Sequence, residues 1–333
     1  MAGQKLPISR MQSKASLLIP SIKGEGQPLY LVLMVGPTAV GKTVTALRLA
    51  ENLGGEIVSA DSRLFYKGMD IGTAKPTREE RSRVPHYLID IAEPDETLSL
   101  SVFQHKAQLV ISGIHARGKL PFLVGGTGQY IRAVVQGWTP PQVKPDLKLR
   151  AEFEKMKEEK GKEWLHNRLK TLDPHAAENI DARNVRRTIR ALEVILVTGR
   201  KFSELRRQGG SPYHLITIGL TRPRAELYDR IDARIEAMFE QGLLDEVRDL
   251  LAKGYSPELS TMSAIGYREC VRVIEGSWSI EEARAAMRRA TRLFVRRQAN
   301  WFKESDPDIR WFQAGEKGVT RAIESFIRDE LRQ

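Results

Sequence analysis

The sequence predicts an α/β protein with a parallel sheet as its core, an all-helical insertion and a helical C-terminal region. Short apolar runs typical of buried strands occupy residues 31–35, 86–91, 120–124 and 214–220, and helical patterns separate them. The first and third of these runs end directly in glycine-rich turns, as strands of parallel sheets do at ligand sites. Residues 146–207 are charge-rich and contain no strand-like run, which indicates an inserted helical unit.

Composition limits the classes of function. The chain has 333 residues, of which 41% are hydrophobic, enough for a large core and about two domains. The lone cysteine, Cys270, excludes an intramolecular disulfide and favours a reducing compartment, so we expect a cytoplasmic protein. The net charge of +11 favours a polyanionic partner. No apolar run is long enough to span a membrane, and we expect a monomer without membrane contact.

The composition and hydrophobic pattern of the chain change at several points, which indicates domain boundaries. Residues 1–28 are basic and serine-containing, and we interpret them as a disordered extension; an organelle transit segment is the alternative. The catalytic α/β core is expected at 29–140 and 212–312, on either side of a helical insertion at 141–211. The remaining residues, 313–333, are expected to form a C-terminal helix or tail.

A phosphate-binding loop follows the first strand. The pattern G-x-x-x-x-G-K-T is formed by Gly36, Pro37, Thr38, Ala39, Val40, Gly41, Lys42 and Thr43. Its glycines let backbone N–H groups point at an anion, and the following helix adds the positive end of its dipole. Lys42 supplies a point charge, and the Thr43 hydroxyl is suited to hold Mg²⁺. The loop predicts that a diphosphate or triphosphate binds here, without saying what carries it.

Two carboxylates follow strand-like runs. The run at 56–62 places Asp61 at a strand end facing the phosphate site, where it could bind magnesium or act as a general base. A turn or helix-capping role is the alternative for Asp61. Asp90, in the run at 86–91, is the rival carboxylate, either a magnesium-side acid or a turn residue.

A second glycine-rich turn, Gly-Gly-Thr-Gly at residues 125–128, follows the strand at 120–124. Such a turn lets the backbone approach a ligand closely, so we expect Thr127 near the phosphate loop. The alternative is a tight strand-to-helix turn in which Thr127 caps the helix.

Helices are predicted between and after these strands. A helix is expected over 99–117, with Ser99 as its N-cap, and another over 129–135. A long helical region is expected over 224–253, with more helix from beyond Pro257 to Trp301, whereas residues 63–76 are expected to be irregular.

Two arginine stripes follow helical periodicity. The first has offsets of 0, 3, 4 and 7 and consists of Arg183, Arg186, Arg187 and Arg190. The second repeats every four residues and consists of Arg284, Arg288, Arg292 and Arg296. No Asp or Glu occurs between Ala283 and Lys303. Because like charges at this spacing repel, both stripes are predicted to contact a phosphate backbone; a solvated basic face is the alternative.

Seven segments, in order, resemble the bacterial tRNA dimethylallyltransferase family, also called isopentenyl-diphosphate:tRNA transferases. They lie at residues 36–43, 61–66, 67–76, 125–130, 190–193, 264–268 and 297–301. The resemblance covers roughly residues 30–312, and the segment Met-Asp-Ile-Gly-Thr-Ala-Lys-Pro within it is more specific than the phosphate loop. It implies a P-loop NTPase-like core whose helical insertion grips the anticodon stem-loop of tRNA.

The resemblance implies transfer of the dimethylallyl group from dimethylallyl diphosphate to N6 of an adenosine beside the anticodon, assisted by Mg²⁺. Lys42 and Thr43 would neutralise the leaving diphosphate, Asp61 would act as base, and Thr127 would position the reacting centre. Ser263 stands where many relatives have arginine, so the diphosphate contact is assigned to Arg268.

Motif matches also imply a set of tRNA-contacting residues. They are Asp61, Ser62, Arg63, Leu64, Arg186, Arg187, Arg190, Met262, Gly266, Tyr267, Arg296, Arg297, Gln298, Trp301 and Lys303. Three other readings compete: an ATP-binding kinase of a small metabolite, a prenyltransferase of free adenine nucleotides, and an RNA-binding module without catalysis. The two arginine stripes, which a kinase would not need, favour a tRNA substrate.

Overall fold

A computed structural model describes residues 28–137, 141, 143, 145–205 and 210–332. The predicted basic extension, apart from its last residue, lies outside the described residues. None of the helices in the described ranges is long and apolar enough to cross a membrane.

The core is one six-stranded sheet in the order β3-β2-β4-β1-β5-β6, and all of its strand pairs are parallel. The strands are β1 (Tyr30–Val35), β2 (Gly55–Ser59), β3 (His86–Tyr87), β4 (Leu120–Val124), β5 (His214–Thr221) and β6 (Arg310–Gln313). The predicted parallel α/β core is therefore confirmed. In a parallel sheet, the carboxyl ends of all strands lie along one edge, where the loops that follow them can meet.

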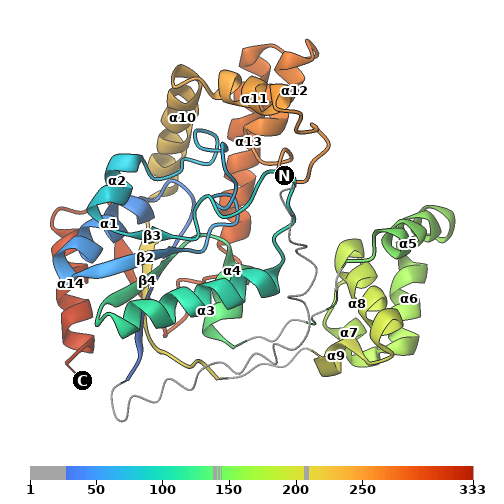
Figure 1. Cartoon of the computed structure of the whole chain (residues 1–333), viewed down its shortest axis with the longest axis horizontal. Coiled ribbons are helices and arrows are strands. Elements are labelled where there is room, and N and C mark those ends of the chain that lie inside the picture. The colour runs from blue at the N-terminus through green and yellow to red at the C-terminus, as the bar shows by residue number, and fades with distance from the viewer. Residues whose placement is uncertain (1–27, 138–140, 142, 144, 206–209, 333) are drawn as a thin grey trace, which may run out of the picture.

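Helices cover both faces of the sheet, because alternate residues of β1 enter two different hydrophobic clusters. One face is covered by α1 (Lys42–Leu53), α10 (Arg224–Glu240) and α14 (Val319–Glu330). The other is covered by α3 (Leu100–Ala116) and α4 (Gly128–Val135). Figure 1 shows the sheet between α1 and α3. The expected Ser99 cap of α3 is confirmed, since its hydroxyl accepts a hydrogen bond from the N–H of Val102.

In the described part of the predicted insertion, the regular elements are all helices, and they have their own hydrophobic cluster. Its helices are α5 (Leu147–Lys160), α6 (Lys162–Leu172), α7 (Pro174–Glu178), α8 (Val185–Thr198) and α9 (Phe202–Leu205). In Figure 1 they stand to one side of the sheet. The fully buried Glu193 joins α8 to the start of α5, because its carboxylate accepts hydrogen bonds from Arg150 and from the N–H of Asp146.

The helical region predicted over 224–253 is two helices. It breaks at Gly242, whose φ of +94° is left-handed, and continues as α11 (Leu243–Ala252). Two further helices follow, α12 (Tyr267–Ile274) and α13 (Ile280–Gln298). α13 packs against both α10 and α12, so these helices form one unit beside the sheet.

Three elements differ from the expectation. The strand expected over 86–91 ends at Tyr87, because Leu88 and Asp90 have φ values of +60° and +56° that turn the chain away. The helix α2 (Arg78–Arg83) was not predicted, although Thr77 and Glu80 form a capping box. Strand β6 was also not predicted; it pairs with β5, and the ring of Trp311 lies against Gly219.

Candidate active site

Three loops meet at the carboxyl edge of the sheet. Strands β2, β4 and β1 are neighbours, with Ser59 and Met34 both in register with Val124, so the loops after them start side by side. The approach is close: a Cβ atom on Gly125 would lie 2.4 Å from the carbonyl oxygen of Ala60. The structure thus brings the phosphate loop, Asp61 and Thr127 together from three separate segments.

The phosphate loop is shaped for an anion. Gly41 has a φ of +116° and precedes the first residue of α1, and that first turn has neither a side-chain cap nor an acidic residue. The Lys42 ammonium donates hydrogen bonds to the carbonyl oxygens of Gly36, at 2.9 Å, and Pro37, at 2.8 Å. The N–H groups at the start of α1 are therefore without a competing anion from their own helix turn.

The charge on Lys42 is destabilised in the free protein. Burial lowers the pKa of Lys42 to about 8, with the positive charge of Arg234 acting in the same direction and Asp61 opposing it. An ammonium held away from water is stabilised by a bound anion. A depressed lysine pKa in a phosphate loop is therefore a property expected of an anion site rather than of a surface turn.

Three arginines at the phosphate loop were not predicted. Nε of Arg222 donates to the carbonyl of Val40 and Nε of Arg230 to that of Ala39, each at 2.8 Å. Arg234, one turn after Arg230 on α10, has its own pKa lowered by burial and then by the charge of Arg230. Within the described chain no hydrogen-bond or ion-pair partner is found for Arg234. The four-residue spacing of Arg230 and Arg234 was the available signal.

The loops that carry Asp61 and Thr127 are in contact at the strand ends. The N–H of Ser62 donates to the Thr127 hydroxyl at 3.5 Å, and the N–H of Arg63 donates to Oδ1 of Asp61 at 3.0 Å. One carboxylate oxygen of Asp61 thus closes a turn, whereas Oδ2 has no hydrogen bond within the described residues. Thr127 stands at the N-cap of α4, but its hydroxyl makes no capping bond, so the capping alternative is wrong.

Gln298 joins two of the loops. Its Oε1 accepts a hydrogen bond from the N–H of Thr38 at 2.8 Å, and its Nε2 donates to the carbonyl of Gly126 at 3.2 Å. The residue is 7% exposed. Motif matching implied that Gln298 contacts tRNA. In the structure, both polar atoms of its side-chain amide make hydrogen bonds within the protein, and these fix the spacing between the phosphate loop and the Thr127 loop.

Trp301 is half-buried and packs on the start of α4. A Cβ on Gly128 would lie 2.3 Å from Cγ of Trp301, so the ring covers the start of α4. Arg132 holds it by a hydrogen bond to its carbonyl at 3.0 Å and a guanidinium 5.3 Å from the ring centre. The Trp301 ring therefore has partners within the protein, and its implied contact with tRNA stays a prediction; Lys303 is exposed.

The arginine stripe of α13 does not form a phosphate-contacting face. Arg284 and Arg288 pair with Glu236 of α10, and Arg292 pairs with Asp232 at 2.7 Å. The prediction failed because the neutralising carboxylates lie on another helix, far away in sequence. Arg296 of the stripe, and its neighbour Arg297, remain exposed.

The α8 stripe is likewise shorter than predicted. Arg183 precedes the helix and pairs with Asp181, and Arg190 is turned inward to Glu193 and the carbonyl of Val143. Arg186 and Arg187 are exposed in the first turn of α8, which contains no acidic residue, and neither has an ion pair with a described residue.

The segment 262–268 mostly supports the fold. Met262 and Tyr267 are fully buried, and the N–H of Gly266 donates to Glu269. Arg268, assigned to the diphosphate by resemblance, instead pairs with Glu269 at 2.6 Å, and no contact between Arg268 and the phosphate loop is found within the described residues. The unpaired arginine at the loop is Arg234.

Asp90 and the first tRNA segment have defined partners. Asp90 pairs with Lys75 at 2.6 Å and with Arg81 at 2.8 Å, so cations of the protein occupy its carboxylate, and its φ of +56° turns the chain. Nη1 of Arg63 donates to the carbonyl of Ser260 at 3.5 Å, which joins the Asp61 loop to the segment before α12. Ser62 and Leu64 are half-buried beside it.

The oxygen ligands that the protein offers at this site suit a magnesium ion only together with phosphate oxygens of a substrate. The described residues contain no group of three or more His, Cys, Asp or Glu side chains able to hold a metal. Thr43 is exposed in the first turn of α1. Magnesium commonly takes one or two protein ligands, several waters and phosphate oxygens, so this sparse set is compatible with it.

These features define an α/β protein with a phosphate loop, a carboxylate and a hydroxyl at one strand edge, and a helical insertion. Residues 64–305 match the family model described as IPP transferase, and residues 29–95 match that of isopentenyl transferase. The chain belongs to the IPP transferase family.

Curated relatives and solved structures belong to the same class of enzyme as the matched family model. The chain is 54% identical to a tRNA dimethylallyltransferase of Roseiflexus sp. (strain RS-1), with 90% of this chain and 97% of the relative covered. It is 45% identical to that of Thermomicrobium roseum, with 91% and 92% covered.

Among solved structures, it is similar to the full-length tRNA isopentenylpyrophosphate transferase of Bacillus halodurans at 42% identity and a TM-score of 0.68, with 91% of this chain and 97% of that chain covered. It is also similar to a eukaryotic dimethylallyltransferase acting on tRNA at 26% identity and a TM-score of 0.74, with 90% and 80% covered.

Proposed function

We propose that this chain transfers the dimethylallyl group from dimethylallyl diphosphate to N6 of adenosine 37, beside the anticodon of tRNA, and releases diphosphate. The observation that carries the proposal is the meeting of Asp61, Thr127 and the phosphate loop at one sheet edge. Family membership adds the reaction class, because tRNA dimethylallyltransferases are similar over 90% of this chain.

The phosphate loop holds the leaving group. The N–H groups at the start of α1, Lys42 and Arg234 surround the place where the diphosphate gathers negative charge as the allylic C–O bond breaks. Mg²⁺, when bound through Thr43 and phosphate oxygens, would add further neutralising charge. Positive charge on the departing carbon skeleton is delocalised over the allyl group, so neutralising the diphosphate is the main demand on the protein.

Asp61 activates the attacking amine. The exocyclic N6 of adenine is a weak nucleophile, because its lone pair is shared with the ring. As the new N6–C bond forms, Oδ2 of Asp61, which has no hydrogen bond within the described residues, accepts the N6 proton. The Thr127 hydroxyl accepts a hydrogen bond at 3.5 Å from the N–H of Ser62, the residue after Asp61, and orients the amine.

RNA is held on two sides. Arg186 and Arg187 on the insertion, and Arg296, Arg297 and Lys303 near the end of α13, are the exposed cations left from the predicted tRNA set. Phosphate contacts of this kind fix the position of the RNA, and the target base must leave its stack to reach Asp61. A base in a single-stranded loop is extruded at least cost, which supports the anticodon loop as substrate.

The test is incubation of the purified protein with unmodified tRNA, dimethylallyl diphosphate and Mg²⁺, followed by mass spectrometry of the nucleosides. We expect dimethylallylated adenosine at position 37 and its loss in Asp61→Asn, with tRNA binding retained. Labelled ATP serves as the control donor. Phosphoryl transfer from ATP with no prenylated adenosine would replace the proposal by the kinase alternative.

A further inference from the structure

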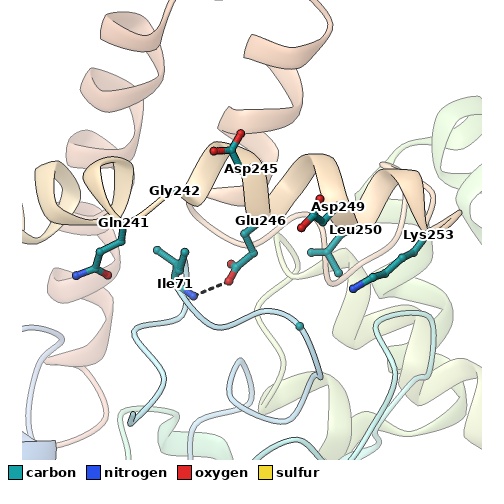
Figure 2. Close-up of a pocket in the computed structure, with 9 residues that line it drawn as sticks. Ile71, Gln241, Gly242, Asp245, Glu246, Asp249, Leu250 and Lys253 are labelled. Carbon is teal, nitrogen blue, oxygen red and sulfur yellow. Dashed lines mark hydrogen bonds between the residues drawn. The ribbon is translucent and has the colours of Figure 1, made fainter. Parts of the chain in front are cut away.

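One carboxylate on α11 collects four hydrogen bonds. Oε2 of Glu246 accepts from the N–H of Asp70 at 2.9 Å and from that of Ile71 at 2.8 Å. Oε1 accepts from the N–H of Gly72 at 3.3 Å and from the hydroxyl of Tyr267 at 2.6 Å. Figure 2 shows the Glu246 side chain pointing from α11 down to the backbone at Ile71. Three consecutive amides on one carboxylate form an anchored backbone nest.

On the side that faces α11, this part of the loop is held by hydrogen bonds. Gly68 and Ile71 border a cavity of about 360 Å³ that lies between the loop and α11, so side chains do not fill this seam. On the other side, the loop rests on Tyr267, since a Cβ on Gly72 would lie 2.5 Å from its ring. Burial raises the pKa of Tyr267, which keeps its phenol protonated as a donor to Glu246.

The anchored loop is the continuation of the segment that carries Asp61. Lys75 follows the anchored residues in the chain, and its side chain is 2% exposed. Its ammonium donates a hydrogen bond to the carbonyl of Tyr66 and pairs with Asp70 and Asp90. The segment from Asp61 to Lys75 is thereby tied to itself, and Glu246 ties it to the helical unit. Nothing in the proposed chemistry uses Glu246, Tyr267 or the cavity.

The helical unit on the other side of this attachment carries cations proposed for RNA. α11 packs on α12, and α12 packs on α13, which ends at Gln298. We propose that Glu246 is a positioning residue for prenyl transfer: it holds residues 70–72, and through them the Asp61 segment, in fixed register with the helices that bind RNA. This inference rests on the proposed function, since it concerns the placement of Asp61 against the bound adenosine.

The experiment compares Glu246→Gln with Asp249→Asn under single-turnover conditions. Gln keeps the shape of the side chain but presents one oxygen and an NH₂ group to four donors. Asp249 is exposed, lies one turn later on α11 and lines the same cavity, so its variant is a matched control for charge. We expect Glu246→Gln to lower the transfer rate per folded molecule at least about tenfold, with the KM for dimethylallyl diphosphate within about threefold. Asp249→Asn should change both less than about twofold.

Hydrogen exchange tests whether Glu246→Gln loosens the anchored residues themselves, whereas the loss of rate at an almost unchanged KM is the readout that a purely structural role would not produce. The amides of residues 70–72 should exchange at least about tenfold faster in Glu246→Gln well below its melting temperature, while those of Thr38 and Val124 keep their rates. Tyr267→Phe retains the ring and removes one hydrogen-bond donor to Glu246, so it should lower the transfer rate two- to fivefold. If Glu246→Gln does not fold, Tyr267→Phe takes its place in both measurements.

The outcomes separate this inference from the proposed function. A wild-type protein that fails to prenylate tRNA overturns the proposed function. A wild-type protein that prenylates tRNA, with Glu246→Gln or its substitute Tyr267→Phe equally fast per folded molecule, overturns only the positioning role. Faster exchange at 70–72 without any loss of rate also counts against it.

Discussion

The phosphate loop and helix α13 are both rich in positive charge, but the structure treats the two regions in opposite ways. At the loop, among the described residues, the Lys42 ammonium donates hydrogen bonds only to backbone carbonyls, and Arg234 has no ion pair. On α13, Arg284, Arg288 and Arg292 are neutralised by carboxylates of α10. The difference teaches that an anion site is marked by cations left desolvated and unpaired, whereas a dense stripe of arginines can simply be a helix–helix contact.

Replacing Lys42 in the phosphate loop should give the largest effect on prenyl transfer. Lys42→Met should lower kcat/KM for transfer about 10³-fold, on the order of 4 kcal/mol, because it removes a preorganised charge from the leaving group. Steady-state kinetics with tRNA in excess measures the effect. Thermal unfolding is the control and should show no loss of stability, since the ammonium is disfavoured in the free protein. Near-normal turnover would place the diphosphate elsewhere.

Arg234 should matter next. Arg234→Met should raise the Kd of dimethylallyl diphosphate about 30-fold, or about 2 kcal/mol, because an unpaired guanidinium beside Lys42 is expected to contact phosphate oxygens. Equilibrium binding of the diphosphate in the absence of tRNA is the measurement. Arg224, exposed at the start of the same helix, provides the matched control Arg224→Met. Equal affinities of the two variants would remove Arg234 from the site.

The pH dependence of binding follows from the lysine. In the free protein the pKa of Lys42 is about 8, below its ordinary 10.5, and a bound anion raises it again. Binding therefore takes up a proton above pH 8, and affinity for the diphosphate should fall up to about tenfold per pH unit as pH rises from 8 toward 10. Calorimetry in buffers of different ionisation enthalpy detects this proton.

The same pKa shift predicts the opposite trend for the free protein. Because folding depresses this pKa, the unfolded state binds more protons between pH 8 and 10.5, and the contribution of Lys42 to stability should increase with pH. A flat affinity profile above pH 8, or an unchanged slope in Lys42→Met, would contradict the assignment of the titration to Lys42.

Replacing an ion-paired arginine of α13 should give the smallest effect on transfer. Arg288→Met should lower the free energy of unfolding by about 1 kcal/mol, or about 2 °C in Tm, because the pairs with Glu236 and Asp232 are about one-third exposed and partly screened. Transfer kinetics should stay within about twofold. Thermal unfolding and a tRNA-binding isotherm check both parts; tRNA affinity that falls tenfold with unchanged stability would restore the phosphate-contact interpretation of the stripe.

Features contained in a single contiguous segment could be predicted from the sequence. The phosphate loop, strands β1, β4 and β5, helix α3 and the helical insertion each have a local pattern, and parallel topology then places Asp61 and Thr127 at one edge. Features that depend on two distant segments could not. The acids facing α13 lie about 50 residues earlier, and the short β6 forms a strand only because β5 offers an edge.

Polar residues of the motifs were also hard to divide between ligand and scaffold. Gln298 and Arg190 stand in segments that resemble RNA-contacting motifs, but their side chains bond within the protein. Their residue types suit either role, and only burial distinguishes them. Arg234 was missed for a different reason: its four-residue spacing from Arg230 places both arginines on one face of α10, but nothing local shows that this face looks at the phosphate loop.

Gln298, as the last residue of α13, touches both substrate sites at once, which has a consequence for the kinetics of the enzyme. Its amide contacts the loop for the diphosphate through Thr38 and the loop of Thr127 through Gly126. If RNA held by Arg296 and Arg297 shifts α13, both loops move together. Thermodynamic reciprocity then requires that tRNA and the prenyl donor change each other's dissociation constants by the same factor. Equilibrium binding of each substrate, with and without the other, measures this common factor.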